Sequence, residues 1–168
     1  MTQVLTDQGT TDQGTAALTA WVRLLRAHAA MARTFNAQLQ AEHGMTINDF
    51  EALLLLSRAP DQQLKRIELS ERIQLTPSGV TRLLDGLLAA GWVAKGECAS
   101  DARVSYAVLT EAGRDKLAQA SRTHTAAVAQ LFTERFDDTE LEALALLLGR
   151  LPGAAEADAG SCEVGAPD

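Results

Sequence analysis

Residues 76–113 have the sequence TPSGVTRLLDGLLAAGWVAKGECASDARVSYAVLTEAG, and this stretch decides the fold. Thr76 is a good helix N-cap, and Pro77 suits the first helical position because the N–H that proline lacks has no helical partner there. Gly91 suits the end of the same helix. The stretch therefore begins with a capped helix that runs to about Ala90.

Two short runs with the composition of β-strands follow this helix, at residues 92–95 and 105–109. The polar residues 96–103 lie between them, so we predict a β-hairpin with a long polar tip. Thr110 then provides an N-cap for a helix of about 25 residues. A helix, a hairpin and a second helix thus follow one another along the chain.

Apolar residues at helical spacing predict the other elements, which are helices at about residues 16–40, 46–59, 68–73 and 137–150. A short helix, a tight turn, a capped helix and a hairpin form the order of a winged helix-turn-helix. The outer helices carry more apolar surface than one small lobe can bury, which favours a dimer. We therefore predict a mainly α fold with a small β-hairpin wing (α+β), made of a winged helix-turn-helix lobe and a helical dimerisation region.

The acidic charge of the chain is concentrated near its two ends. The 168 residues carry a net charge of −7, which at first sight argues against a nucleic-acid partner. However, the first 20 and the last 17 positions hold six acidic and no basic side chains, which leaves 15 basic and 16 acidic ones between them. A nearly neutral body can carry a local basic face, so a nucleic-acid partner is compatible with this composition.

The composition also predicts the domain organisation and the compartment. The expected organisation is a disordered tail at 1–14, one domain at 15–151 with dimerisation helices at about 15–44 and 110–151 around a winged helix-turn-helix at about 46–109, and a disordered acidic tail at 152–168. No apolar run is long enough to span a membrane, and the first residues lack the pattern of a signal peptide. With two cysteines and no disulfide framework, we expect a cytoplasmic protein.

The helix that follows Thr76 has one apolar and one polar side. Its polar side carries Ser78, Thr81 and Arg82 near the N-terminal end, where unpaired N–H groups and the helix dipole add positive charge. Such a helix end fits the DNA major groove, where arginine binds guanine through two hydrogen bonds and serine or threonine contacts bases or phosphates. The alternative is an ordinary surface helix, and the hairpin favours the DNA interpretation.

Further basic residues lie beside this helix in the predicted fold. Arg103 is at the hairpin tip, where it suits a narrow and negative minor groove, and Asp101 can hold its guanidinium. The alternative is a solvated turn with two incidental charges. Lys65 and Arg66 precede the short third helix, where they contact phosphates or simply face solvent. The predicted DNA-contacting residues are Lys65, Arg66, Thr76, Pro77, Ser78, Thr81, Arg82, Asp101 and Arg103.

Four segments of the chain, TPSGVTRLLD from Thr76, GWV from Gly91, DAR from Asp101 and LTEAG from Leu109, resemble the MarR (multiple antibiotic resistance regulator) family. The resemblance implies a homodimer interlocked through the first, fifth and sixth helices, which binds double-stranded DNA at a pseudo-palindromic operator. It implies a repressor of neighbouring genes that is relieved by a small ligand. Ile67 stands where family members often have a Ser or Thr helix cap, which leaves the start of the third helix open.

The signal that such a regulator senses is left open by the sequence. A phenolic or other aromatic compound is one candidate effector, and Trp21, His28, Arg33 and Phe50 could line its pocket. A zinc-responsive regulator is an alternative because Glu42 and His43 are possible ligands, and Cys98 on the wing makes a thiol-responsive one another. A closed zinc site needs more ligands than these, so we expect no metal and no cofactor.

Two functions of other classes compete with DNA binding. An enzyme is disfavoured because the chain has no nucleophile elbow, phosphate-binding glycine loop or dinucleotide fingerprint. A helical dimeric adaptor could keep the fold without binding DNA. The presence of Arg82 and Arg103 favours the regulator over the adaptor.

Overall fold

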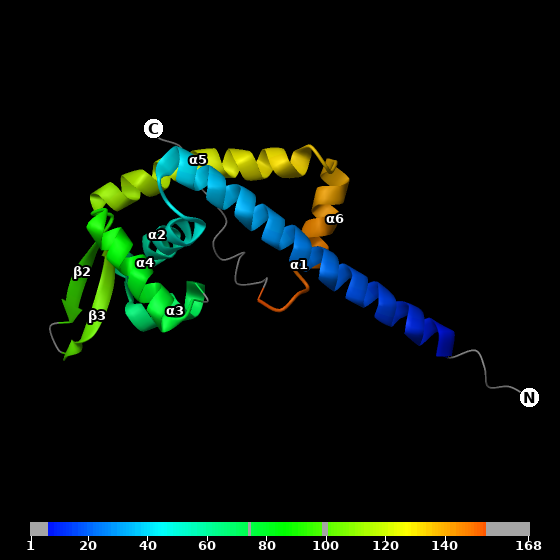
Figure 1. The fold of residues 1–168 in the computed structure, drawn as a ribbon, viewed down its shortest axis with the longest axis horizontal. Coiled ribbons are helices and arrows are strands. Elements are labelled where there is room, and N and C mark those ends of the chain that lie inside the picture. Colours follow the sequence, from blue (N-terminus) through cyan, green and yellow to red (C-terminus); the bar gives the residue numbers. More distant parts are fainter. Residues whose placement is uncertain (1–6, 74, 99–100, 154–168) are drawn as a thin grey trace, which may run out of the picture. The chain divides into compact units, whose positions relative to one another are not determined.

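The computed structural model describes residues 7–73, 75–98 and 101–153 and is drawn in Figure 1. It divides into two compact units, with the boundary between Ile47 and Asn48. Among the described residues, no helix is both long and apolar enough to cross a membrane.

The first unit is dominated by one long helix, α1 (Asp7–His43). The sequence placed its start near residue 16 and assigned residues 1–14 to a tail, but residues 7–14 are helical. Once a helix has formed, each added residue gains a hydrogen bond at little further cost, which explains this extension. The predicted end at Gly44 is confirmed, because this residue has a φ of +63° that favours glycine.

The second unit contains all the other elements and matches the predicted fold class. In chain order these are α2 (Ile47–Arg58), a 3-10 turn (Pro60–Gln62), β1 (Gln63–Lys65), α3 (Arg66–Ile73), α4 (Pro77–Ala89), β2 (Val93–Cys98), β3 (Asp101–Leu109), α5 (Glu111–Thr133) and α6 (Asp138–Leu148). In Figure 1, α3, α4 and the β2–β3 hairpin lie together at one end of this unit, and α5 leads away from them. The fold is thus mostly helical with one small sheet, as the sequence predicts.

The sheet has three antiparallel strands in the order β1-β3-β2, where the sequence predicted two. The extra strand pairs Gln63 with Val108 and Lys65 with Tyr106. It escaped prediction because a three-residue strand has a single buried side chain, Leu64, and so shows no alternating pattern.

The wing hairpin is longer than predicted and its tip is shorter. Gly96 pairs with Tyr106 and Glu97 with Ser105, so most of the polar segment that was assigned to the tip belongs to the strands. A register shift between Glu97 and Cys98 marks a bulge near the end of β2. Polar residues pair as well as apolar ones through their backbone, which is why composition alone misplaced the strand ends.

The third helix begins at Arg66, two residues before its predicted start. Glu68 Oε2 accepts a hydrogen bond from the Lys65 N–H at 3.2 Å, which is the half of a capping box that a carboxylate three residues into the helix provides. Lys65 Nζ also lies 3.8 Å from Glu68 Oε1. Glu68 therefore interacts with both the backbone and the side chain of Lys65 at the start of this helix.

The base of the wing is tied closely to the start of α5. Thr110 caps α5 by accepting from the Gly113 N–H at 3.0 Å, and its hydroxyl donates to the Gly91 carbonyl at 2.7 Å. A Cβ at Gly113 would collide with the Trp92 carbonyl oxygen, so this position needs glycine. The position of α4 relative to the sheet is fixed at this joint.

Candidate nucleic-acid interface

The start of α4 is built by local hydrogen bonds. Thr76 Oγ1 accepts from the Gly79 N–H at 3.2 Å and lies 3.2 Å from Ser78 Oγ, and Pro77 occupies the first turn as predicted. A Cβ at Gly79 would approach Thr76 Oγ1 to 3.2 Å, so this glycine leaves room for the cap. The helix end is thereby held in one conformation while Thr76, Pro77 and Ser78 stay exposed.

The two faces of α4 are as different as the sequence predicts. Val80, Leu83, Leu84 and Leu87 are buried on one side. Thr81, Arg82 and Asp85 are exposed on the other. The polar face is therefore available to a partner over its first three turns, and the buried face holds it against the rest of the unit.

Arg66 links the start of α3 to this polar face. Its Nη2 donates a hydrogen bond to Thr81 Oγ1 at 3.1 Å, and Thr81 Oγ1 in turn donates to the Pro77 carbonyl at 3.0 Å. Arg66 was predicted to contact a phosphate or face solvent, and its contact with Thr81 was not foreseen. The structure thus brings Arg66, Pro77 and Thr81 together.

A groove with a volume of about 470 Å³ lies beside this contact. It is lined by Lys65, Arg66, Ile67, Ser70, Pro77, Val80, Thr81 and Ser105. Sequence reasoning missed Ile67, Ser70 and Ser105 as part of this surface. Of these three, only Ile67 could have been noticed in the sequence, because it is an apolar residue at a position where a polar one was expected. In the structure Ile67 is 65% exposed.

The wing residues can be placed only in part. Asp101 and Arg103 belong to β3, and Cys98 ends β2 opposite Asp101. The side chains of all three lie outside the described part of the structure. The predicted pairing of Asp101 with Arg103, the minor-groove role of Arg103 and a thiol response of Cys98 therefore stay predictions.

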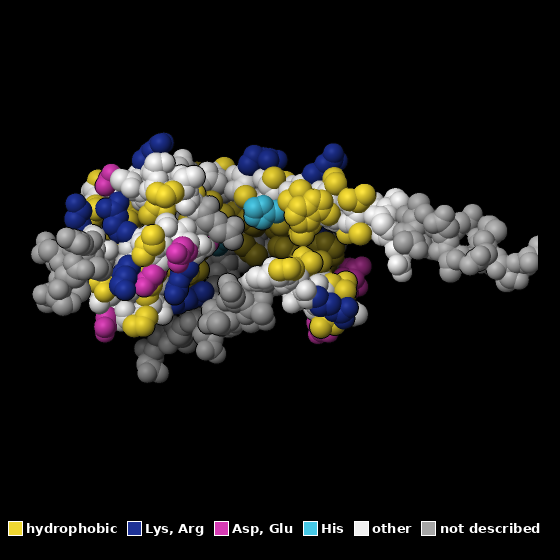
Figure 2. All heavy atoms as spheres, turned by 90° about the horizontal axis from the view of Figure 1, so that it is seen from below, with side chains coloured by type: hydrophobic (Ala, Val, Ile, Leu, Met, Phe, Trp, Pro, Cys, Tyr) yellow, Lys and Arg dark blue, Asp and Glu magenta, His cyan; other side chains and the backbone are white. Residues whose placement is uncertain are grey.

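Charge on the described surface is mixed rather than uniformly basic. Figure 2 shows Lys and Arg side chains interspersed with acidic ones on the face that it draws. Near the groove, Lys65 is paired with Glu68, whereas Arg82 is exposed. Electrostatic attraction for a polyanion thus depends on a few local cations rather than on net charge.

The predicted effector residues fall in two units. Trp21, His28 and Arg33 are exposed on α1, with the Trp21 side chain 56% exposed. Phe50 lies on α2 with 8% exposure, and its ring centroid is 4.9 Å from that of His124. Burial also lowers the pKa of the His124 imidazole below its ordinary value. Phe50 is therefore a core residue, and the effector pocket remains a prediction.

No metal site can be assembled from the described residues, which contain no cluster of three His, Cys, Asp or Glu side chains suited to an ion. Glu42 and His43, the candidate zinc ligands, lie next to each other at the end of α1, with His43 Nε2 3.8 Å from Glu42 Oε2. Two adjacent side chains do not complete the four-ligand shell that structural zinc requires.

The second unit has the defining parts of a winged helix-turn-helix protein: α3, a turn, the exposed helix α4 and a β2–β3 wing completed by β1. A model of the MarR family matches residues 43–104, which include α3, the turn, α4, β1, β2 and the start of β3. Over this segment the chain is similar to the MarR family.

Individual relatives agree with this assignment. The chain is 32% identical over 111 residues to the HTH-type transcriptional repressor YetL of Bacillus subtilis, and the alignment spans 66% of each protein, just under two thirds. Its structure resembles AbsC, a MarR family transcriptional regulator from Streptomyces coelicolor, with a TM-score of 0.70 at 27% identity over 95% of this chain and 99% of AbsC. A second regulator of that family and organism, solved in complex with DNA, gives a TM-score of 0.71 at 24% identity over 88% of this chain and 87% of its own.

Proposed function

We propose that this chain acts in the cytoplasm as a homodimeric, DNA-binding transcription regulator that represses its target genes until a small aromatic compound binds. The observation that carries the proposal is the exposed polar face of α4, which starts from a rigid cap and has its opposite face buried. The relative YetL is named a transcriptional repressor, and a regulator with this fold was solved with DNA. Both support the proposal.

The proposed contacts follow from the geometry of α4. Its N-terminal end enters the major groove, where Arg82 binds guanine through two hydrogen bonds and Ser78 contacts a base or phosphate. Lys65 and Arg66 lie beside this end and bind phosphates, which fixes the register of the protein on the duplex. Arg103 on the wing enters the adjacent minor groove.

The proposed dimer explains exposed apolar surface in both units. Leu18, Trp21, Val22 and Leu25 are exposed on α1. Leu146, Leu147 and Leu148 are exposed on α6. The charges are complementary, because residues 13–41 hold three arginines and no acidic residue while α6 holds three acidic and no basic residues. A second copy of the chain therefore offers each face a partner of matching chemistry.

The proposed operator and signal follow from this assembly. Two copies of α4 related by a two-fold axis fit half-sites about one helical turn apart, so the operator is a pseudo-palindrome. An aromatic acid that binds only the folded dimer raises the melting temperature, which a thermal-shift screen measures. Substitution of Trp21, His28 or Arg33, which are exposed on α1, should abolish that shift.

A mobility-shift experiment on the DNA upstream of the gene tests DNA binding. We expect Arg82→Ala to weaken binding by about 1–3 kcal/mol and to relax sequence preference, and Arg103→Ala to reduce the salt dependence of binding. Arg135→Ala is the matched control, because Arg135 is exposed beyond the end of α5 and its side chain bonds, within the described part of the chain, only to Leu131 and Glu134 of the adjoining turn. Parent-like binding by both test variants would show that the groove assignments are wrong.

A further inference from the structure

The hydroxyl of Thr81 is already committed within the protein. A threonine hydroxyl has one hydrogen to donate and two lone pairs to accept with. Thr81 Oγ1 donates that hydrogen to the Pro77 carbonyl at 3.0 Å and accepts from Arg66 Nη2 at 3.1 Å. The hydroxyl therefore has no hydrogen left for the acceptor groups of a DNA base.

These two hydrogen bonds also fix the other branch of the side chain. Threonine has a single side-chain torsion, and in helices it divides between two rotamers because its hydroxyl can bond to the preceding turn. The bond from Arg66 favours one of them. With Oγ1 held between α3 and the first turn of α4, this exposed residue has no donor left for a partner and offers its methyl group Cγ2 and one lone pair of Oγ1.

Ser78 provides a contrast on the same helix face. Among the described residues its hydroxyl has one contact, the 3.2 Å approach to Thr76 Oγ1, in which either atom can donate. Serine has no methyl group, and this hydroxyl can turn toward DNA. The two hydroxyl residues near the start of α4 thus present different chemistry, a polar group at Ser78 and an apolar one at Thr81.

In the major groove, thymine differs from cytosine by an oxygen acceptor and by its C5-methyl group, and a threonine methyl is a recognised apolar contact for that group. We propose that Thr81 is a specificity-determining residue that selects thymine through methyl–methyl contact. Arg66 is a positioning residue that holds the Thr81 hydroxyl away from the base. This inference rests on the proposed binding of α4 in the major groove.

Two duplexes that differ only in thymine methyl groups test the inference whatever the operator sequence is. One is the upstream DNA made with thymidine, and the other is the same sequence made with deoxyuridine throughout. For the wild-type protein we expect the deoxyuridine duplex to bind about fourfold more weakly per half-site, as burial of one methyl group supports. The readout is the ratio of the two Kd values, which cancels effects common to both duplexes.

Three variants separate the methyl from the hydroxyl. Thr81→Ser removes the methyl and should bring the ratio near to 1. Thr81→Val keeps a methyl and removes the hydroxyl, so the ratio should stay close to the wild-type value whatever happens to affinity. Arg66→Ala releases the hydroxyl and should lower the ratio. Circular dichroism melting checks that each variant folds, which the exposure of Thr81 leads us to expect.

Several outcomes overturn the proposal. A wild-type protein that binds both duplexes with equal affinity overturns it and leaves the proposed function standing. If Thr81→Ser keeps the full preference for the thymidine duplex, a group other than the Thr81 methyl recognises thymine. If Thr81→Val loses the preference, the hydroxyl recognises it. A wild-type protein that binds neither duplex overturns this inference together with the proposed function.

Discussion

Helices α4 and α6 have similar lengths and similar leucine content but opposite surroundings. With 13 and 11 residues, both begin at a side-chain cap. In α4 the cap leads into four buried apolar residues, whereas α6 has no buried residue at all. Leucine content therefore shows that a helix needs an apolar partner, and it does not show whether the partner lies in the same chain.

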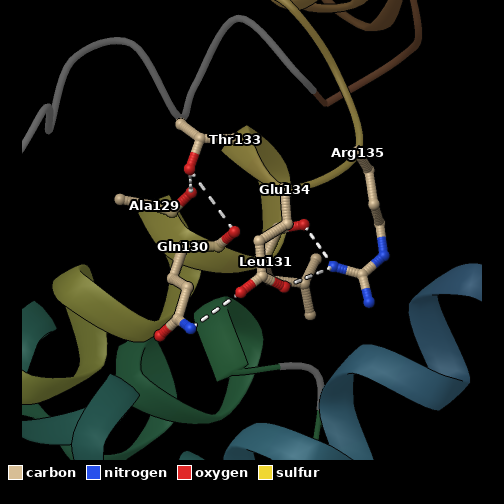
Figure 3. Close-up of polar contacts among 6 residues, drawn as sticks. All are labelled: Ala129, Gln130, Leu131, Thr133, Glu134 and Arg135. Atoms are coloured by element: carbon tan, nitrogen blue, oxygen red, sulfur yellow. Dashed lines mark hydrogen bonds and ion pairs between the residues drawn. The ribbon is translucent and has the colours of Figure 1, made fainter.

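The end of α6 that joins α5 is nevertheless well ordered. Asp137 and Glu140 form a capping box in which each side chain bonds to the backbone of the other residue. Figure 3 shows the last turn of α5 and the two residues that follow it, where hydrogen bonds and an ion pair join Ala129, Gln130, Leu131, Thr133, Glu134 and Arg135. A helix as short as α6 is marginal by itself in water, so local caps define its start and, in the proposed dimer, the second copy supplies its packing.

The largest loss of stability is expected from a substitution on the buried face of α4. Leu84 on α4 is 3% exposed, and Leu84→Ala should destabilise the fold by about 2–5 kcal/mol through lost burial and a cavity. Urea unfolding followed by circular dichroism measures the change. The same substitution at Leu146, which is 63% exposed in the single chain, should alter the free energy of unfolding far less when the two variants are compared at a protein concentration where both are monomeric. Equal losses at the two positions would contradict the difference drawn between the helices.

Self-association should respond to α6 and not to α4. Leu147 is 55% exposed, and Leu147→Glu places a charge in the proposed dimer contact, so we expect association to weaken about 100-fold. Sedimentation velocity over a range of protein concentrations measures this change. Ala89→Glu, at an exposed position near the end of α4, is the matched control and should leave the dimer intact. A wild-type chain that sediments as a monomer at all concentrations would remove the basis of the comparison.

The features that sequence predicted correctly are those decided within a few residues. The caps Thr76 and Thr110 each accept a hydrogen bond from the backbone three residues later, so residue type and local spacing are sufficient to find them. The polar face of α4 follows from helical periodicity in the same way.

The features that sequence missed depend on partners far along the chain. Strand β1 forms because Leu64 pairs with Ala107 on β3. The three residues of β1 are too few to show a sequence pattern that predicts this pairing. The bond from Arg66 to Thr81 requires α3 to pack against α4, so the commitment of the Thr81 hydroxyl was invisible in the sequence. Asp61 and Gln62 have positive φ values without the glycine that would predict them. The sequence thus predicted the exposed polar face of α4 and missed the hydrogen bond that occupies the Thr81 hydroxyl.

The smallest expected change in stability comes from two glycines, one within α4 and one just after it. Gly86 is exposed on this helix, and a Cβ built there meets nothing within 4 Å. Gly86→Ala should therefore stabilise the protein by about 0.5–1 kcal/mol, because alanine loses less backbone freedom on folding. The same change at Gly91, where φ is +74°, should destabilise it because alanine is strained there. Thermal melting of both variants under identical conditions measures two shifts of opposite sign. A destabilised Gly86→Ala would mean that this face of α4 packs against something in the assembled protein, and the helix would then resemble α6 more than the single chain suggests.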